Sequence, residues 1–107
     1  MAQSAERLEL EVSRTLALDY LLHLPDAHGH DPGKSWPLIL FLHGGQERGD
    51  DLELVKRHGV PAMAERDPAF PFIVVSPQCP TDSWWSSHMD ALDELLRLVC
   101  ASHAVDE

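Results

Sequence analysis

Residues 37–50 have the sequence Pro-Leu-Ile-Leu-Phe-Leu-His-Gly-Gly-Gln-Glu-Arg-Gly-Asp. The apolar run from Leu38 to Leu42 predicts a strand that is buried on both of its faces. This strand ends in a turn whose backbone N–H groups are available to a ligand, and its residues are His43, Gly44, Gly45 and Gln46. A buried strand followed by a glycine-rich turn is how α/β enzymes direct backbone donors at a developing oxyanion. The stretch therefore predicts an α/β fold with an oxyanion-binding turn.

The size and charge of the chain limit the number of domains and the kinds of partner that we expect. A chain of 107 residues buries about two-thirds of its unfolded surface, and a hydrophobic fraction of 44% favours a packed core. We therefore expect residues 1–107 to form a single domain. Eighteen acidic against eight basic side chains give a formal net charge of −10. This charge disfavours nucleic acid and anionic membranes as partners, because both require a basic face.

The N-terminus and the cysteines indicate a compartment. The first residues lack the pattern of a signal peptide, and no apolar run reaches membrane-spanning length, so we expect a cytoplasmic protein with no membrane partner. Cys79 and Cys100 are too few for a disulfide framework or a metal knuckle, so both are expected as thiols. His28, His30 and Asp31 lie in a loop without further ligands in reach. We expect no metal and no cofactor.

The hydrophobic pattern predicts further strands and helices on both sides of this stretch. Alternating residues over 8–12 and over 16–24, joined by a short link at 13–15, favour an antiparallel hairpin, and 25–36 is expected as a loop. We expect a helix capped by Asp50 or Asp51 that runs to His58, and a second helix over 61–66. A strand over 72–75 should follow and end before Pro77. The last expected helix has an apolar stripe over 92–100 and begins at a capping box of Ser87 with Asp90.

This order predicts an incomplete sheet. Two doubly buried strands separated by a helix imply a parallel pair with a crossover helix, preceded here by the antiparallel hairpin. Such strands need neighbours on both edges, and the sequence ends after a helix, where a further strand is expected. The pattern therefore indicates an unfinished sheet with an unpaired edge.

Three blocks of sequence carry a resemblance to a known family. Residues 43–50, the block Phe-Ile-Val-Val-Ser-Pro-Gln-Cys-Pro at 72–80, and the pair Trp84-Trp85 resemble the N-terminal half of α/β-hydrolase-fold serine esterases. The branch they resemble holds the feruloyl-esterase-like and polyhydroxybutyrate-depolymerase-like carboxylesterases, which are related to the prolyl oligopeptidase group. The resemblance runs from about Leu8 to the C-terminus, so it covers nearly all of this chain but only part of such an enzyme.

The resemblance implies roles for the turn and for the tryptophans. In these enzymes the N–H after the His-Gly pair, here that of Gly45 with Gln46 beside it, forms one arm of the oxyanion hole. The residue after the nucleophilic serine supplies the other arm. That serine lies beyond the positions matched here, as do the acid and histidine of the triad. Trp84 and Trp85 would line an acyl pocket, although at least one is expected in the core. No Gly-x-Ser-x-Gly motif occurs, and the nearest approach, at Ser35, is interrupted by proline.

Two motifs in these blocks have a structural explanation beside the catalytic one. We expect His43 to orient the turn through a backbone hydrogen bond rather than to act as a base. Glu47 and Arg48 are expected to form an ion pair that holds the loop rather than to clamp a substrate carboxylate.

A cluster of catalytic residue types lies near the last predicted helix. Ser86, Ser87 and His88 with Asp90 contain all the residue types of a triad, but neighbours on one helix start cannot align in series. Helix capping explains Ser87 and Asp90 without chemistry.

Three functions remain open from the sequence. The first is a carboxylic-ester hydrolase of the serine type that has the oxyanion part of the site without the nucleophile, and so has weak or no activity alone on small ester substrates. The second is a non-catalytic assembly module. The resemblance implies that the strand Leu38 to Leu42 lies between the next strand in sequence and a strand that is absent here, so it would be an open apolar edge. Such a module would pair through Leu38 to Leu42, either as a homodimer or with a complementing C-terminal half. The third is a compact esterase with a rearranged catalytic set such as Ser86 or Ser87 with a histidine.

Overall fold

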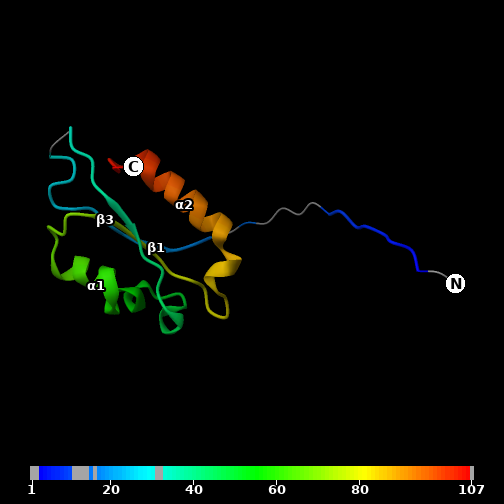
Figure 1. The fold of residues 1–107 in the computed structure, drawn as a ribbon. Coiled ribbons are helices and arrows are strands. Elements are labelled where there is room, and N and C mark those ends of the chain that lie inside the picture. The colour runs from blue at the N-terminus through cyan, green and yellow to red at the C-terminus, as the bar shows by residue number, and fades with distance from the viewer. Residues whose placement is uncertain (1–2, 11–14, 16, 31–32, 107) are drawn as a thin grey trace.

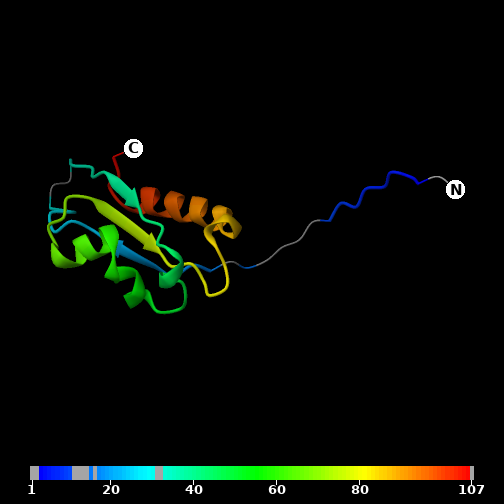
Figure 2. The same ribbon diagram turned by 60° about the horizontal axis from the view of Figure 1, so that its bottom comes forward.

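A computed structural model describes residues 3–10, 15, 17–30 and 33–106 of the chain. Its strands and helices are, in chain order, β1 (Tyr20–His23), β2 (Leu38–Leu40), η1 (Gly45–Glu47), η2 (Leu52–Arg57), α1 (Gly59–Arg66), β3 (Ile73–Pro77), η3 (Trp85–Ser87) and α2 (Met89–Ser102), where η marks a 3-10 helix. Figures 1 and 2 show α1 and α2 on opposite faces of a small sheet. None of the helices in the described ranges is long and apolar enough to cross a membrane.

The sheet has the order β1-β3-β2. β3 pairs with β1 in antiparallel orientation, with Tyr20 opposite Pro77, and with β2 in parallel, with Leu38 opposite Ile73. The parallel pair is connected through α1, as two apolar strands separated by a helix predict. A mixed sheet with helices on both faces confirms the expected α/β class.

The core is built around β3, whose five residues are all buried. Ile73 and Val75 point to one face of the sheet, where they pack with Leu95 and Val99 of α2. These α2 residues belong to the apolar stripe expected over 92–100, so that prediction is confirmed. β2 differs from the prediction of a doubly buried strand, because its three residues are only half-buried. Within the described ranges it has one neighbouring strand, β3.

The strand expected over 8–12 is wrong in its described part. Residues 8–10 have no strand structure, and the Leu8 and Leu10 side chains are 86% and 75% exposed. Alternation of apolar and charged residues fits a strand only where a second strand offers hydrogen bonds. β1 finds that partner in β3 and not in a hairpin. The remainder of the expected hairpin, at 11–14 and Leu16, lies outside the described residues.

β3 extends further than its prolines predict. Pro77 still lies within the strand, and Gln78 continues the ladder by donating its N–H to the Asp19 carbonyl. Hydrogen-bond direction alternates along a strand, and Ile73 donates toward β2, to Pro37. The donor that Pro77 lacks would therefore point past the end of β2 and not at β1. A proline at that position leaves the β1–β3 ladder intact.

The segment 104–106 approaches the outer edge of the sheet beside β2. Trp36 donates its N–H to the Ala104 carbonyl and accepts from the Asp106 N–H, both at 2.7 Å, in a parallel bridge to Val105. The carbonyl of the next residue, Pro37, points to β3 instead. The two neighbours therefore lie on opposite sides of the chain that leads into β2. Within the described ranges, no segment pairs with the outer edge of β2 itself.

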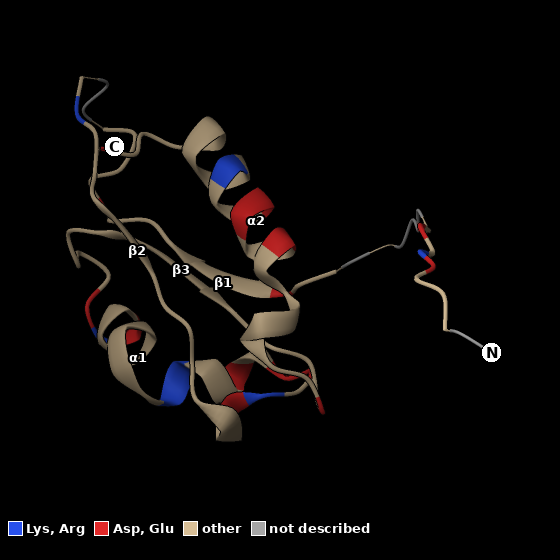
Figure 3. Cartoon of the chain, turned by 45° about the vertical axis from the view of Figure 1, so that its right-hand side comes forward, with Lys and Arg blue, Asp and Glu red and all other residues tan. Residues whose placement is uncertain are grey.

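The surface charges are mainly acidic, in agreement with the composition. Figure 3 shows Asp and Glu grouped on α2 and near η2, with Lys and Arg placed singly among them. On α2, Asp93 and Glu94 are exposed and both pair with Arg97, at 3.1 and 3.5 Å. Exposed pairs of this kind contribute little to stability, so their main effect is on the surface potential.

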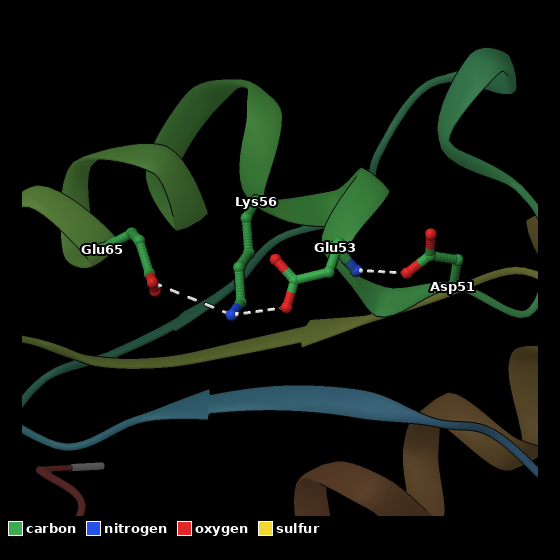
Figure 4. Close-up of polar contacts among 4 residues, drawn as sticks. All are labelled: Asp51, Glu53, Lys56 and Glu65. Atoms are coloured by element: carbon green, nitrogen blue, oxygen red, sulfur yellow. Dashed lines mark hydrogen bonds and ion pairs between the residues drawn. The ribbon is translucent and has the colours of Figure 1, made fainter.

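The segment between β2 and α1 confirms the expected cap. The Asp51 side chain accepts a hydrogen bond of 3.0 Å from the Glu53 N–H (Figure 4), although 52–57 is a 3-10 helix. Lys56 then reaches the carboxylates of Glu53 and Glu65, at 3.1 and 3.7 Å (Figure 4), which hold η2 against α1. The hydrogen bond to Glu53 and the two negative charges raise the pKa of Lys56.

The connection from η2 into α1 requires a glycine. Gly59 begins α1 with φ of +63°, and a Cβ there would lie 2.7 Å from the Phe41 ring. Both the backbone angle and the close approach exclude larger residues. The expected helix over 61–66 is confirmed within α1.

The capping box expected at the start of α2 is wrong. The helix begins at Met89, with His88 as the N-cap residue and no side-chain cap bond. Ser87 belongs instead to η3, where its N–H donates to the Trp84 carbonyl. The tight turn at η3 delays the helix start beyond the position that the Ser87–Asp90 box needs.

Candidate active site

The predicted turn lies where the two parallel strands end. Phe41 donates to the Val75 carbonyl just after β2, and the chain then enters 43–46. β3 ends at the same edge and continues into Gln78 and Cys79. Carboxyl ends of neighbouring parallel strands are the usual place for ligand sites in open α/β sheets.

His43 is buried, with 4% of its surface exposed, and both ring nitrogens bind backbone groups. The Cys79 N–H donates to Nε2 at 2.9 Å, so Nε2 carries no proton. Nδ1 therefore holds the proton and donates to the Gly44 carbonyl at 2.5 Å. A base would need a free Nε2, whereas these contacts are those of a residue that orients the turn. The ring also packs on Trp85, whose indole N–H donates to the His43 carbonyl at 3.1 Å.

The turn presents two backbone donors. Gly44 has extended backbone angles and precedes η1, whose first residues are Gly45 and Gln46. The N–H groups at the start of a helix have no intrahelical acceptor, and both residues are exposed. Both N–H groups are therefore accessible to a ligand at the surface of the turn.

The two tryptophans lie differently. Trp85 is buried with Cys79 and Leu92, so it is the core residue that the sequence analysis anticipated. Trp84 is 48% exposed, and a Cβ on Gly45 would lie 3.7 Å from its ring. Trp84 therefore forms an apolar wall next to the donors of the turn.

Arg48 links the turn to the loop that follows β3. Its Nε donates to the Gly45 carbonyl and its Nη1 to the Ser83 carbonyl, both at 3.0 Å. The guanidinium lies over the Trp84 ring, 5.2 Å from the centroid. The expected Glu47–Arg48 ion pair is wrong, since no such contact exists between these two described residues. Arg48 donates to backbone carbonyls instead.

Glu47 and Gln78 complete the support of the turn. The Gln78 amide donates to the carbonyls of Glu47 and Asp51, at 2.9 and 2.8 Å, and so ties η1 to η2. The Glu47 carboxylate lies 3.9 Å from His58 Nε2. Sequence reasoning had no role for Gln78, because its partners are backbone groups of a distant loop.

The cluster of Ser86, Ser87 and His88 does not form the contacts of a triad. Ser86 and Ser87 are exposed, and within the described ranges no side-chain hydrogen bond joins either of them, or Asp90, to His88. His88 Nε2 instead lies 2.6 Å from Ser83 Oγ. Ser83 was missed because nothing in its local sequence marks it.

Cys79 is a buried thiol between these parts. Burial raises its pKa, while the Arg48 charge and a side-chain hydrogen bond with Ser83 act in the opposite direction. The thiol form is therefore favoured, as the sequence analysis expects. A buried thiol with a raised pKa is a poor nucleophile.

Other parts of the described chain offer less chemistry. A cavity of about 220 Å³ lies between β1 and α1, away from the turn, and its polar groups His23, Lys56 and Glu65 already have partners. In the described ranges, no group of three or more His, Cys, Asp or Glu side chains could hold a metal ion. Asp31 lies outside those ranges.

No protein-family model matches the chain, and no curated protein matches it.

Proposed function

We propose that this chain carries the oxyanion-binding part of a serine-type carboxylic-ester hydrolase with an α/β-hydrolase fold. The observation that carries the proposal is the turn at the carboxyl edge of the parallel strands. There the neutral His43 ring fixes the backbone, and the N–H groups of Gly45 and Gln46 have no helical acceptor.

The strand order supports the same proposal. In the family that the sequence resembles, the strand before the oxyanion turn lies between the strand that follows it in sequence and a further parallel strand. β2 has β3 on one side, and the bridge between Trp36 and Val105 begins on the other. β1 pairs in antiparallel orientation with the other edge of β3, and the resulting strand order β1-β3-β2 agrees with this arrangement.

The chemistry follows from the donors. When a nucleophile adds to an ester carbonyl, the carbonyl oxygen becomes negatively charged, and hydrogen bonds to it strengthen. Donors already in place stabilise that transition state without reorganisation, so they accelerate attack even by water. Since no Gly-x-Ser-x-Gly motif occurs in the chain, we expect slow ester hydrolysis.

The surroundings favour a small neutral ester. The net charge of −10 and the acidic residues on α2 (Figure 3) repel anionic substrates. The exposed Trp84 ring beside Gly45 supplies apolar surface for an acyl or alcohol group.

Two substitutions of Gly45, one that removes its N–H group and one that keeps it, test the proposal. Gly45→Pro removes one donor, and the extended angles of Gly44 together with the first helical position accept a proline. Gly45→Ala keeps the N–H, and its Cβ would make only ordinary contact with Trp84. We expect hydrolysis of p-nitrophenyl acetate by Gly45→Pro to fall about tenfold or more below that of Gly45→Ala. Equal rates in the two variants would rule the proposal out.

The edge position of β2 favours a second candidate, an assembly module. Bonds toward β3 come from Pro37 and Phe41, so by alternation the N–H groups of Leu38 and Leu40 point to the open side. We propose that a second copy, or a complementing C-terminal half, pairs with this edge.

Light scattering after size-exclusion chromatography tests the second candidate. Leu40→Pro removes an outward donor, whereas Leu40→Ala loses the same apolar packing and keeps that donor. A homodimer that persists in Leu40→Ala and dissociates in Leu40→Pro is expected. A monomer at all concentrations in the unsubstituted protein argues against self-pairing.

A further inference from the structure

Ser83 and His88 form the closest contact between a nucleophilic and a basic side chain in the described part of the molecule. Ser83 Oγ lies 2.6 Å from His88 Nε2, and both residues are half-buried. Hydroxyl and imidazole within hydrogen-bond reach are the basic unit of nucleophilic catalysis. Asp82, with φ of +62°, turns the chain directly before Ser83.

The pair lies beside the oxyanion turn. Arg48 binds the Gly45 carbonyl with Nε and the Ser83 carbonyl with Nη1, both at 3.0 Å. One guanidinium therefore fixes the backbone of the turn and the backbone of the serine at the same time. Its charge also favours an oxyanion that forms near Ser83.

We propose that Ser83 and His88 act as a nucleophile and its base, and that Ser83 accepts the acyl group of small activated esters. The substrate class rests on the proposed function, whereas the pair itself rests on the contact between the two side chains. Ser83 has, in this proposal, the role of nucleophile that the sequence resemblance assigns to a serine on a later strand.

The reaction has two balanced steps. Ser83 Oγ forms a bond to the carbonyl carbon while its proton passes to His88 Nε2, and the tetrahedral intermediate then collapses. The bond to the alcohol oxygen breaks, and that oxygen takes the proton from Nε2. Water then attacks acyl-Ser83, giving its proton to Nε2, and the Ser83 oxygen leaves with that proton. The products are the alcohol and the acid, with no change in oxidation state.

The neighbouring cysteine does not compete for this role. Cys79 is fully buried, and burial favours its thiol form. Ser86 and Ser87 are exposed and have no side-chain contact with the imidazole among the described residues. Ser83 therefore combines a hydroxyl, a neighbouring base and a nearby cation.

Labelling with diisopropyl fluorophosphate tests the inference. We expect a single phosphoryl adduct, located on Ser83 by tandem mass spectrometry and absent from Ser83→Ala. His88→Gln is expected to slow labelling about 100-fold, because the base is lost. Ser35→Ala, a change in an exposed loop serine, should label at the unsubstituted rate.

An adduct on any other residue, including Ser86, or an equal rate in Ser83→Ala, overturns the inference. The Gly45→Pro result is independent of it. Hydrolysis that depends on the Gly45 N–H but leaves Ser83 unlabelled keeps the proposed function and removes this inference. Labelling of Ser83 that is equal in Gly45→Pro and Gly45→Ala keeps the nucleophile and removes the role of the turn.

Discussion

β2 and β3 are both built on three consecutive aliphatic residues but have different surroundings. β3 lies between two strands and two helical layers, and all five of its residues are buried. β2 has one neighbouring strand, and its three residues are half-buried. The difference shows that an apolar run predicts a strand but not its place in a sheet. The central strand supplies stability, and the edge strand delivers the functional turn with one side left open.

A matched pair of substitutions measures this difference directly. Ile73→Ala in β3 should lower the free energy of unfolding by about 4 kcal/mol, because a fully buried side chain leaves a cavity. Ile39→Ala in β2 should cost about 2 kcal/mol or less, because the side chain is half-buried. Urea denaturation monitored by tryptophan fluorescence gives both values. Equal losses would contradict the assignment of β2 to the edge.

The second prediction concerns the contact that joins the ends of the two strands. His43→Ala leaves the Cys79 N–H without its acceptor and removes a ring that packs on Trp85. We expect a loss of about 3 kcal/mol in the free energy of unfolding. His58→Ala is the control, because that side chain is 71% exposed and should change stability little. Comparable effects of the two substitutions would show that His43 does not hold the turn.

The third and smallest effect concerns pH at the end of β3. Burial raises the pKa of the folded Cys79 thiol above its ordinary value of 9.0. The unfolded chain therefore loses this proton at lower pH than the folded one, so the contribution to stability is complete below pH 9.0 and is lost as pH rises. Urea titrations between pH 8 and 10 should show falling stability in the unsubstituted protein. Cys79→Ala should show a smaller fall, and an identical fall would contradict the burial of the thiol.

The sequence predicts the parts of the fold that local pattern controls. Both apolar strands, the glycine-rich turn and the stripe on α2 follow from periodicity and from turn chemistry. The strand at 8–10 fails because alternation does not specify a partner. Pro77 shows the same limit. Whether a strand accepts a proline depends on whether a neighbouring strand needs the backbone N–H that proline lacks, and the local sequence does not specify that neighbour.

The candidate site was predicted less completely. The turn at 43–46 was found because its residues are contiguous, whereas its supports are not. Arg48 reaches Ser83 across 35 positions, and the His43 ring binds the Cys79 N–H across 36. Contacts over such distances depend on how β2 and β3 align, which local sequence does not encode. Ser83 and His88 are only five positions apart, but no sequence pattern marks their contact.

The most direct measurement is an NMR titration of the backbone amides with phenylphosphonate, a stable tetrahedral anion. If the turn holds an oxyanion, the amide resonances of Gly45 and Gln46 should move with saturable, identical binding curves. Gly29, an exposed glycine in a loop remote in sequence from the turn, should not move and serves as the control. Shifts confined to Gly45, Gln46 and their neighbours would support the account. Shifts spread evenly over the protein, or none at the turn while other amides respond, would contradict it.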